Sequence, residues 1–168
     1  MVEVNLLDPS YAKDYRSLLL EAYASSPDAF TSTPDERALE PESWWMKRLD
    51  VHLGESLVIG AFAKGALVGT VALEFSARTK TRHKAQVMAM YVQAASRGQG
   101  IARRLLECLM WHAQNRPFLK VLTLTVTQGN LPAESLYGSF GFKVFGVEPM
   151  AIASGGEFLA KVHMFREI

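Results

Sequence analysis

The sequence predicts a single α/β domain in which helices flank a mixed sheet. Short runs with apolar residues at every second position alternate with longer runs whose apolar residues recur every three or four positions. Along the chain these runs give the order β-α-α-β-β-β-α-β-α-β-β, which is typical of an α/β domain. The 168 residues contain no internal repeat, low-complexity stretch or linker, so we expect one domain over residues 1–168.

The first half of the chain predicts three strands and two helices. Residues 2–8 alternate as a first strand, and Asp8-Pro9-Ser10 is a good start for the helix that follows. Residues 25–33 read as a loop, and Pro41 opens a second helix. Two strands at residues 57–63 and 67–75 form a hairpin through Lys64-Gly65. The apolar faces of the two helices carry Tyr15, Leu18, Leu19 and Ala22, and then Trp44, Trp45 and Leu49, with one of the two tryptophans in the core.

The second half begins after a polar connection at residues 78–84. We expect strands at residues 86–92, 118–126, 143–153 and 157–166, the last two joined through Gly155-Gly156. Residues 131–140 predict a short helix. A longer helix begins near residue 101, and its apolar face carries Ile101, Leu105, Cys108, Leu109 and His112.

The charge, the apolar runs and the cysteine content of the chain indicate which binding partners and which cellular location to expect. A formal charge of +1 argues against binding to nucleic acid or to an anionic membrane. No apolar run approaches the roughly 20 residues that span a bilayer, and the first residues lack the features of a signal peptide. The single cysteine, Cys108, excludes an internal disulfide, and the four histidines lack metal-ligand spacing. We therefore expect a cytoplasmic protein without a metal.

Residues 96–103, with the sequence SRGQGIAR, lie between a predicted strand and a predicted helix. The free N–H groups of a helix start carry about half a positive charge. Gly98 and Gly100 leave the backbone open to a ligand and permit positive φ angles. Arg97, Arg103 and Arg104 add positive charge. The segment therefore predicts a site for a phosphate or another anion, although a tight turn with solvated arginines would leave the same pattern.

A second motif downstream supports a family resemblance. Residues 97–102 and the downstream segment NLPAESLYGSFGF at residues 130–142 resemble the GCN5-related N-acetyltransferases (GNAT). The first pattern of that family is matched by Arg97, Gly100 and Ala102. The second is matched by Asn130, Ala133, Leu136-Tyr137 and Gly141-Phe142. The resemblance is best over residues 68–168, and it implies a GNAT-like fold with a mostly antiparallel central sheet.

This resemblance implies transfer of an acetyl group from acetyl-CoA, as co-substrate, to an amine. Residues 97–103 would hold the pyrophosphate mostly through backbone N–H groups, and the pantetheine arm would lie where two strands splay apart. An N–H near Tyr91 or Val92 would polarise the thioester carbonyl. The implied cofactor-binding residues are Met90, Tyr91, Val92, Arg97, Gly98, Gln99, Gly100, Ile101, Ala102, Arg103, Asn130, Ala133 and Tyr137.

Two catalytic roles follow from the chemistry and from the resemblance. An alkyl amine is almost entirely protonated at neutral pH, so the reaction calls for a general base or a water relay to one. Glu74, at the end of a strand beside the cofactor strand, is our first candidate, and His83, Glu148 and His163 are the others. The alternative for each of the four is a surface or strand-edge residue without a catalytic role. The resemblance assigns Tyr137 as the acid that protonates the departing thiolate, with a packed aromatic as the alternative.

The acceptor is not identified by the sequence, and three readings stay open. We expect a small-molecule primary amine; a peptide or protein N-terminus and a non-catalytic acyl-CoA-binding module are the alternatives. Residues 35–42, DERALEPE, hold four acids that would attract a cationic amine, or they form a solvated face. The apolar hairpin at residues 149–165 favours a homodimer, which is common in the family.

Overall fold

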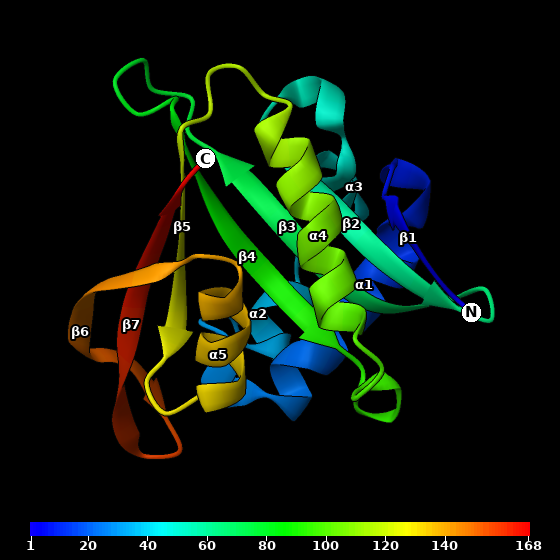
Figure 1. Cartoon of the computed structure of the whole chain (residues 1–168). Coiled ribbons are helices and arrows are strands. Elements are labelled where there is room, and N and C mark those ends of the chain that lie inside the picture. The colour runs from blue at the N-terminus through cyan, green and yellow to red at the C-terminus, as the bar shows by residue number, and fades with distance from the viewer.

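The computed structural model describes all residues 1–168 and forms a seven-stranded sheet in the order β1-β2-β3-β4-β5-β7-β6 (Figure 1). All neighbouring strands are antiparallel except β4 and β5. The strands are β1 (Val2–Leu6), β2 (Ser56–Ala63), β3 (Ala66–Phe75), β4 (Lys84–Val92), β5 (Val121–Thr127), β6 (Lys143–Ser154) and β7 (Glu157–Glu167). The α-helices are α1 (Ala12–Ser25), α2 (Pro34–Ala38), α3 (Glu42–Leu49), α4 (Ile101–Gln114) and α5 (Leu131–Ser139). The predicted α/β fold with a mostly antiparallel sheet is confirmed.

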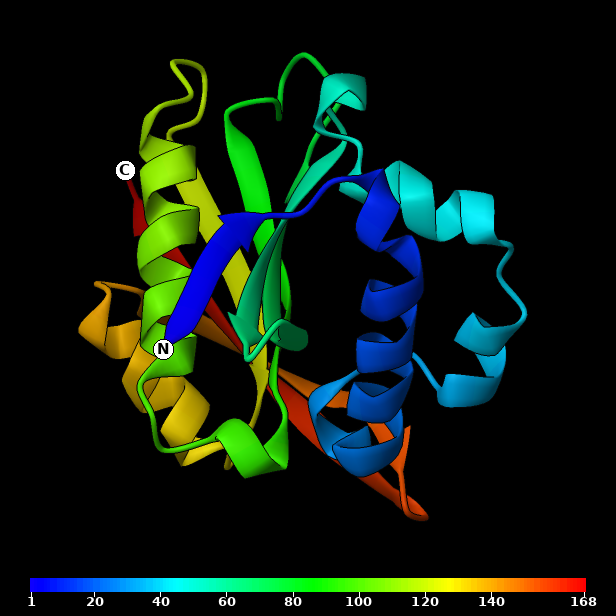
Figure 2. The same ribbon diagram turned by 90° about the vertical axis from the view of Figure 1, so that its right-hand side faces the viewer.

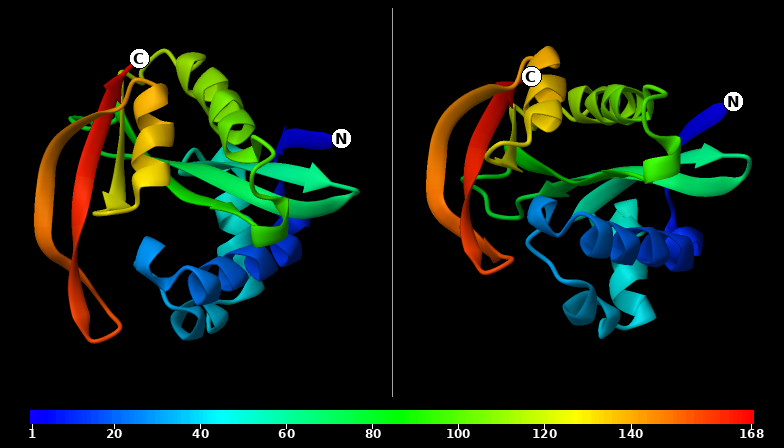
Figure 3. Two further views of the ribbon diagram at one scale, coloured as in Figure 1. Left: turned by 60° about the horizontal axis from the view of Figure 1, so that its bottom comes forward. Right: turned by 90° about the horizontal axis from the view of Figure 1, so that it is seen from below.

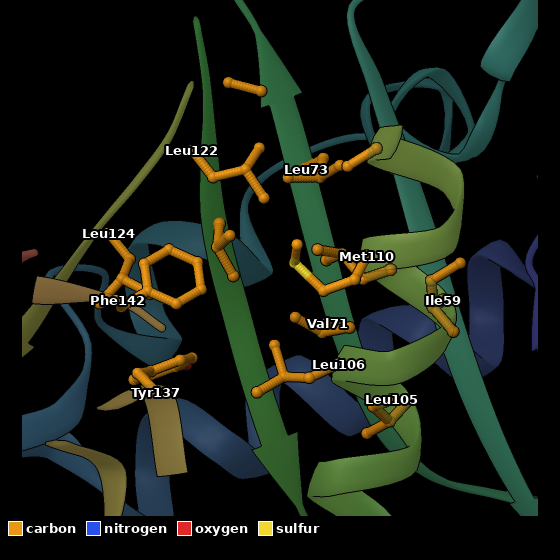
Figure 4. Packing of buried hydrophobic residues seen from close by; sticks show 14 of the residues in the cluster. Ile59, Val71, Leu73, Leu105, Leu106, Met110, Leu122, Leu124, Tyr137 and Phe142 are labelled. Atoms are coloured by element: carbon orange, nitrogen blue, oxygen red, sulfur yellow. The ribbon is translucent and has the colours of Figure 1, made fainter. Parts of the chain in front are cut away.

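Helices cover both faces of the sheet. Figure 2 shows α4 and α5 on one side and α1, α2 and α3 on the other. The larger core lies under α4 and α5, where Leu105, Leu106 and Met110 of α4 pack on Val71 and Leu73 of β3 (Figure 4). The smaller core lies between the sheet and the helices α1 and α3. Both layers are therefore built from the two apolar faces of the same central strands.

The smaller core confirms the predicted faces of the first two helices. Tyr15, Leu18, Leu19 and Ala22 of α1 are buried, as are Trp45 and Leu49 of α3. The rings of Tyr15 and Trp45 meet edge to face, with centroids 5.9 Å apart. Trp44 is only partly buried, so one of the two tryptophans is in the core, as expected.

The structure corrects the prediction in three places. A short helix, α2, follows the predicted loop and was missed, although its capping box is visible in the sequence: the Thr33 side chain accepts from the N–H of Glu36 while the Glu36 carboxylate accepts from the N–H of Thr33. The core face of α4 includes Leu106, Met110 and Ala113, because this helix lies across several strands and buries a wide stripe. Cys108 and His112 lie at its margin, only partly buried.

The third correction concerns the start of β5. The strand begins at Val121 rather than at Phe118. The N–H of Leu119 donates to the carbonyl of Arg116, which closes a turn where the sequence favoured a strand. The ring of Phe118 is exposed and lies 4.5 Å from the guanidinium carbon of Arg82.

The feature that creates room for a ligand is the divergence of β4 from β5. The two strands pair over only three positions, from Lys84 opposite Val121 to Gln86 opposite Thr123. Figure 1 shows them side by side at their upper ends and separated at their lower ends. A β-bulge shifts the register of β4 against β3 beyond Met88, and Ala89 in that bulge has a φ of 53°. Antiparallel ladders on both sides hold the sheet together while its centre is split.

No helix of the chain is both long and apolar enough to cross a membrane.

The smaller core predicts a loss of stability at alkaline pH. Burial raises the pKa of Tyr15 to about 12, against the opposing effect of the nearby Arg48 cation. The unfolded chain releases this proton from about pH 10, so above that pH it binds fewer protons than the folded chain. The free energy of unfolding therefore falls as pH rises, by about 1 kcal/mol from this group at about pH 11. Urea unfolding of Tyr15→Phe should show a correspondingly smaller alkaline loss, and an unchanged loss would contradict the assignment.

Candidate active site

The loop between β4 and α4 has the backbone geometry that the sequence predicts. Gly98 and Gly100 have φ angles of 75° and 73°, and Gly100 is the N-cap of α4. A Cβ atom added at either glycine would meet no atom of the chain within 4 Å. The space above both glycines is therefore open, and the free N–H groups of the first turn of α4 border it. This arrangement fits an anion such as a pyrophosphate.

The arginines of this loop are held by the chain rather than directed together at one point. Arg97 donates from Nε to the carbonyl of Val92 at 2.9 Å, and Arg103 donates to the Ser139 hydroxyl at 3.0 Å. Arg104 donates to the carbonyl of Val2 at 2.7 Å, on the side of β1. Each of these contacts occupies only part of a guanidinium group, so the loop offers both its backbone N–H groups and the remaining guanidinium donors to an anion.

A cavity of about 230 Å³ lies where β4 and β5 diverge. Its walls come from distant parts of the chain: the end of α1 with the loop that follows it, α2, α3, the bulge of β4, β5, the start of α5, and β7. Met90, Asn130, Ala133 and Tyr137, all predicted from the sequence, are among the lining residues. The cavity therefore brings the predicted pantetheine region and the N-terminal helices to one place.

The bulge of β4 forms part of this lining. Met88, Ala89 and Met90 line the cavity. Tyr91 and Val92 follow them on the strand, outside the lining, and the Tyr91 hydroxyl is hydrogen-bonded to Glu21 and Ser25 of α1. Sequence reasoning missed Met88 and Ala89. Alanine is an uncommon residue at positive φ, so nothing in the sequence marks the bulge.

Asn130 sits at the junction of β5 and α5. Its side-chain oxygen accepts from the N–H of Ala133 at 3.3 Å and so caps α5. The same residue lines the cavity. One asparagine thus fixes the start of α5 and borders the space in which a pantetheine arm would lie.

Tyr137 lies about two turns further along α5. Only 6% of the residue is exposed, and its ring packs on Phe142 at a centroid distance of 5.9 Å (Figure 4). Its hydroxyl forms no hydrogen bond within the chain, and the residue lines the cavity. Burial raises the pKa of Tyr137, so the hydroxyl stays protonated and available as a donor.

The four candidate bases all lie outside the cavity lining. Glu74 is exposed on β3, opposite Gln86 of β4, which does line the cavity. His83 is exposed in the turn before β4. Glu148 and His163 pair with each other across β6 and β7, with Oε2 and Nε2 2.9 Å apart. No group of three or more His, Cys, Asp or Glu side chains is arranged to hold a metal.

The charged side chains in the lining are all cationic. They are Arg37 of α2, Arg48 of α3 and Lys161 of β7, and no Asp or Glu accompanies them. The acids of residues 35–42 have other positions: Glu36 closes the capping box of α2, and Glu40 pairs with Arg37 at 3.6 Å. The expectation that this acidic segment attracts a cationic amine is therefore not met by the cavity. Sequence reasoning missed the cationic wall because its members are far apart in the chain.

Hydrogen bonds join the chain segments on the acceptor side of the cavity. Lys161 donates to the Thr31 hydroxyl at 2.7 Å, and Thr127 donates to the carbonyl of Asp28 at 2.5 Å. Ser154 of β6 donates to the Asp28 carboxylate. Figure 3 shows the β6–β7 hairpin reaching to the side of the sheet that carries α1 and α2. The loop after α1 is thereby tied to β5 and to the hairpin.

Comparison with known proteins gives a family match and close similarity of fold. Residues 15–142 match the acetyltransferase (GNAT) family. An acetyltransferase of the GNAT family from Streptococcus pneumoniae is 22% identical, with a TM-score of 0.87 over 100% of both chains. A phosphinothricin acetyltransferase from Sinorhizobium meliloti, solved in complex with acetyl-CoA, is 19% identical, with a TM-score of 0.85 over 99% of this chain and 88% of that one. A ribosomal-protein-alanine N-acetyltransferase from Brucella melitensis is 22% identical, with a TM-score of 0.82 over 99% of each chain.

No curated protein sequence matches the chain. The family match covers more than half of the chain, and the split sheet, the glycine loop and the cavity agree with it. The chain belongs to the acetyltransferase (GNAT) family and is an acetyltransferase.

Proposed function

We propose that this chain transfers an acetyl group from acetyl-CoA to the primary amine of a small molecule. The observation that carries the proposal is the cavity, which is lined by Asn130 and Tyr137 of the cofactor side and by Arg37 and Arg48 of the N-terminal helices. A reaction between two bound molecules requires such a place, where both are held in contact. The volume of about 230 Å³ suits a small acceptor.

The chain offers a coherent set of groups for acetyl-CoA. The open backbone at Gly98 and Gly100 and the N–H groups of the first turn of α4 would hold the pyrophosphate. The remaining residues that we propose at this site are Met90, Tyr91, Val92, Arg97, Gln99, Ile101, Ala102, Arg103, Asn130 and Ala133. When bound, acetyl-CoA supplies the activated acetyl group.

Tyr137 is the residue that we propose as general acid. Transfer forms a bond between the amine nitrogen and the acetyl carbon and breaks the bond from that carbon to sulfur. The sulfur then needs a proton; Tyr137 lines the cavity, and its hydroxyl has no hydrogen-bond partner in the chain. The high pKa that burial gives this hydroxyl ensures that it carries a proton at neutral pH.

The acceptor amine must lose a proton before it attacks. The cations that line the cavity, without a carboxylate among them, disfavour a bound ammonium ion and so lower the pKa of the amine. Glu74 stays our proposal for the base. Because it lies outside the lining, its link to the amine would run through water beside Gln86.

The hydrogen bonds that join the segments on the acceptor side favour a small acceptor over a peptide. A peptide would run between the loop after α1 and the β6–β7 hairpin, where a second hollow of about 340 Å³ lies. The hydrogen bonds of Asp28 to Ser154 and of Thr31 to Lys161 tie the two walls of this hollow together. A non-catalytic acyl-CoA-binding module would have no use for the unbonded hydroxyl of Tyr137. Both alternatives therefore receive less support from the site.

The test is an acceptor panel scored by thiol release from acetyl-CoA. Small primary amines and short peptides are compared at equal concentration, with mass spectrometry of the acceptors as the second readout. We expect acetylation of members of the small-amine group at rates well above those of the peptides. Faster acetylation of peptide N-termini would replace this proposal with the peptide alternative, and binding of acetyl-CoA without any transfer would replace it with the non-catalytic one.

We also propose that the chain forms a homodimer through its C-terminal hairpin. β6 is an edge strand, and Phe145 and Met150 on it, together with Phe158 on β7, are 59–66% exposed. Exposed apolar side chains along an unpaired edge favour pairing with a second strand. Light scattering at micromolar concentration should give twice the mass of one chain. The mass of a single chain would overturn this proposal and leave the proposed reaction untouched.

A further inference from the structure

We propose that the acceptor amine also carries an oxyanion, a carboxylate or a phosphonate, and that Arg37 and Arg48 bind it. The inference rests on the proposed function, because it names the class of small amine that the acceptor side of the cavity selects. It implies compounds of the amino acid and aminophosphonate kind rather than simple alkyl amines or polyamines.

The charge of the acceptor wall is the first observation. Arg37, Arg48 and Lys161 line the cavity, and no Asp or Glu lies among the lining residues. A site for a plain cationic amine would place a carboxylate near the ammonium group. Here an anion is the group that the wall attracts, and a polyamine is repelled.

The two guanidinium groups are held in position by Trp44. The guanidinium carbon of Arg37 lies 4.6 Å from the centroid of the Trp44 ring, and that of Arg48 lies 4.5 Å from it. Arg37 is also fixed by donation from Nε to the Ser32 hydroxyl at 3.0 Å. Both cations act on the phenol of Tyr23, another residue of the lining, whose pKa is raised by burial and lowered by each of them. The arginines thus converge on one region before any ligand enters.

Carboxylates of the chain do not fully balance the positive charge of Arg37 and Arg48. Arg48 is partly buried, yet it forms no ion pair with a carboxylate of the chain; its neighbours are the Trp44 ring, the sulfur of Met88 at 3.9 Å and the neutral hydroxyl of Tyr15. Arg37 has one carboxylate neighbour, Glu40, at 3.6 Å. A partly buried guanidinium group without a counter-ion has lost hydrogen bonds to water, and no acceptor of the chain replaces them. An oxyanion that accepts two parallel hydrogen bonds would provide both the acceptors and the counter-charge.

These arginines lie apart from the groups that we assign to the pyrophosphate. Gly98 and Gly100 are absent from the cavity lining, whereas Arg37 and Arg48 belong to it. The oxyanion in question is therefore that of the acceptor, because the pyrophosphate of acetyl-CoA would be held outside this cavity, at the β4–α4 loop. This separation allows the two to be tested independently.

The experiment uses the wild-type chain as the enzyme and compares sets of matched acceptors with one another. Each set contains an α-amino acid, its carboxamide, the decarboxylated amine and the aminophosphonate of the same side chain, and kcat/KM for acetyl transfer is measured for each. We expect the acid or the phosphonate to exceed its carboxamide by about 10–100-fold, since hydrogen bonds to charged groups are worth this much. The difference between acid and phosphonate identifies the oxyanion.

Arg48→Gln then tests the residue itself. The ratio of acid to carboxamide should collapse toward one, while the affinity for acetyl-CoA and the melting temperature stay close to those of the parent chain. Lys47→Gln is the matched control: it removes a cation from the neighbouring position of α3, where Lys47 pairs with Glu55 away from the cavity. Arg48→Lys should recover only part of the selectivity, because an ammonium group cannot bind an oxyanion as a planar fork.

Two outcomes would overturn the inference. In the first, the wild-type chain acetylates the carboxamides or decarboxylated amines as well as the acids. In the second, Arg48→Gln retains the selectivity of the parent chain. In either case acetyl transfer to a small amine would stand; only the failure of every small amine, with acetyl-CoA bound, would remove the proposed function as well.

Discussion

Replacing Tyr137 by phenylalanine is expected to lower the rate of acetyl transfer by about 100-fold. The hydroxyl lines the cavity and has no partner in the chain, so its removal takes away a proton donor and little else. The effect lies at the lower end of general acid catalysis, since a thiol with a pKa near 8.5 leaves tolerably as a thiolate. Single-turnover measurement with a good acceptor separates this step from product release.

The same substitution distinguishes catalysis from packing. Tyr137→Phe keeps the ring that packs on Phe142, so the melting temperature and the affinity for acetyl-CoA should stay near the parent values. Tyr137→Leu, which removes the ring, should lower both the rate and the melting temperature. A phenylalanine variant with the parent rate in single turnover would show that Tyr137 is only a packed aromatic residue.

Gly100→Val is expected to weaken acetyl-CoA binding by about 10–100-fold, the value of one or two hydrogen bonds to a charged group. A Cβ at this position meets no atom of the chain within 4 Å, so its side chain would occupy space that the proposed pyrophosphate requires. The expected change in affinity is measured by calorimetry with acetyl-CoA.

Backbone strain is the competing explanation, and the chain offers a control for it. Gly54 has a φ of 71°, close to the 73° of Gly100, and a Cβ there also meets nothing within 4 Å. Gly54→Val therefore carries a similar conformational penalty at a position in the turn before β2, outside the β4–α4 loop. Arg104→Ala is a second control, because its guanidinium binds the carbonyl of Val2. An equal loss of affinity in Gly54→Val would mean that Gly100 acts through stability alone.

The elements that the sequence predicts are those governed by local chemistry. Gly98 and Gly100 take the positive φ angles expected of them, because glycine is the residue that adopts this conformation without strain. The alternation of β5 places Leu122, Leu124 and Val126 in the core, as its pattern requires. Asn130 caps α5 at the position that the second motif marks.

The features that sequence reasoning missed depend on contacts between distant segments. The bulge at Ala89 arises where β4 pairs with β3 and leaves β5, and alanine carries no mark of it. Arg37, Arg48 and Lys161 share one cavity only after the N-terminal helices have packed on one face of the sheet and β7 has paired with β5. The four acids of residues 35–42 were instead proposed to attract the amine, because they lie close together in the sequence. Capping and ion pairing, which are local, use two of them before any ligand arrives.

The most direct test of the account follows a labelled acetyl group. The chain is incubated with acetyl-CoA that carries carbon-13 in the acetyl group and with a mixture of small primary amines, and the products are analysed by mass spectrometry. We predict that the label appears on the nitrogen of a small amine, with one free coenzyme A thiol for each amide formed. Recovery of the label as free acetate, or as intact acetyl-CoA with every amine unchanged, would contradict the account.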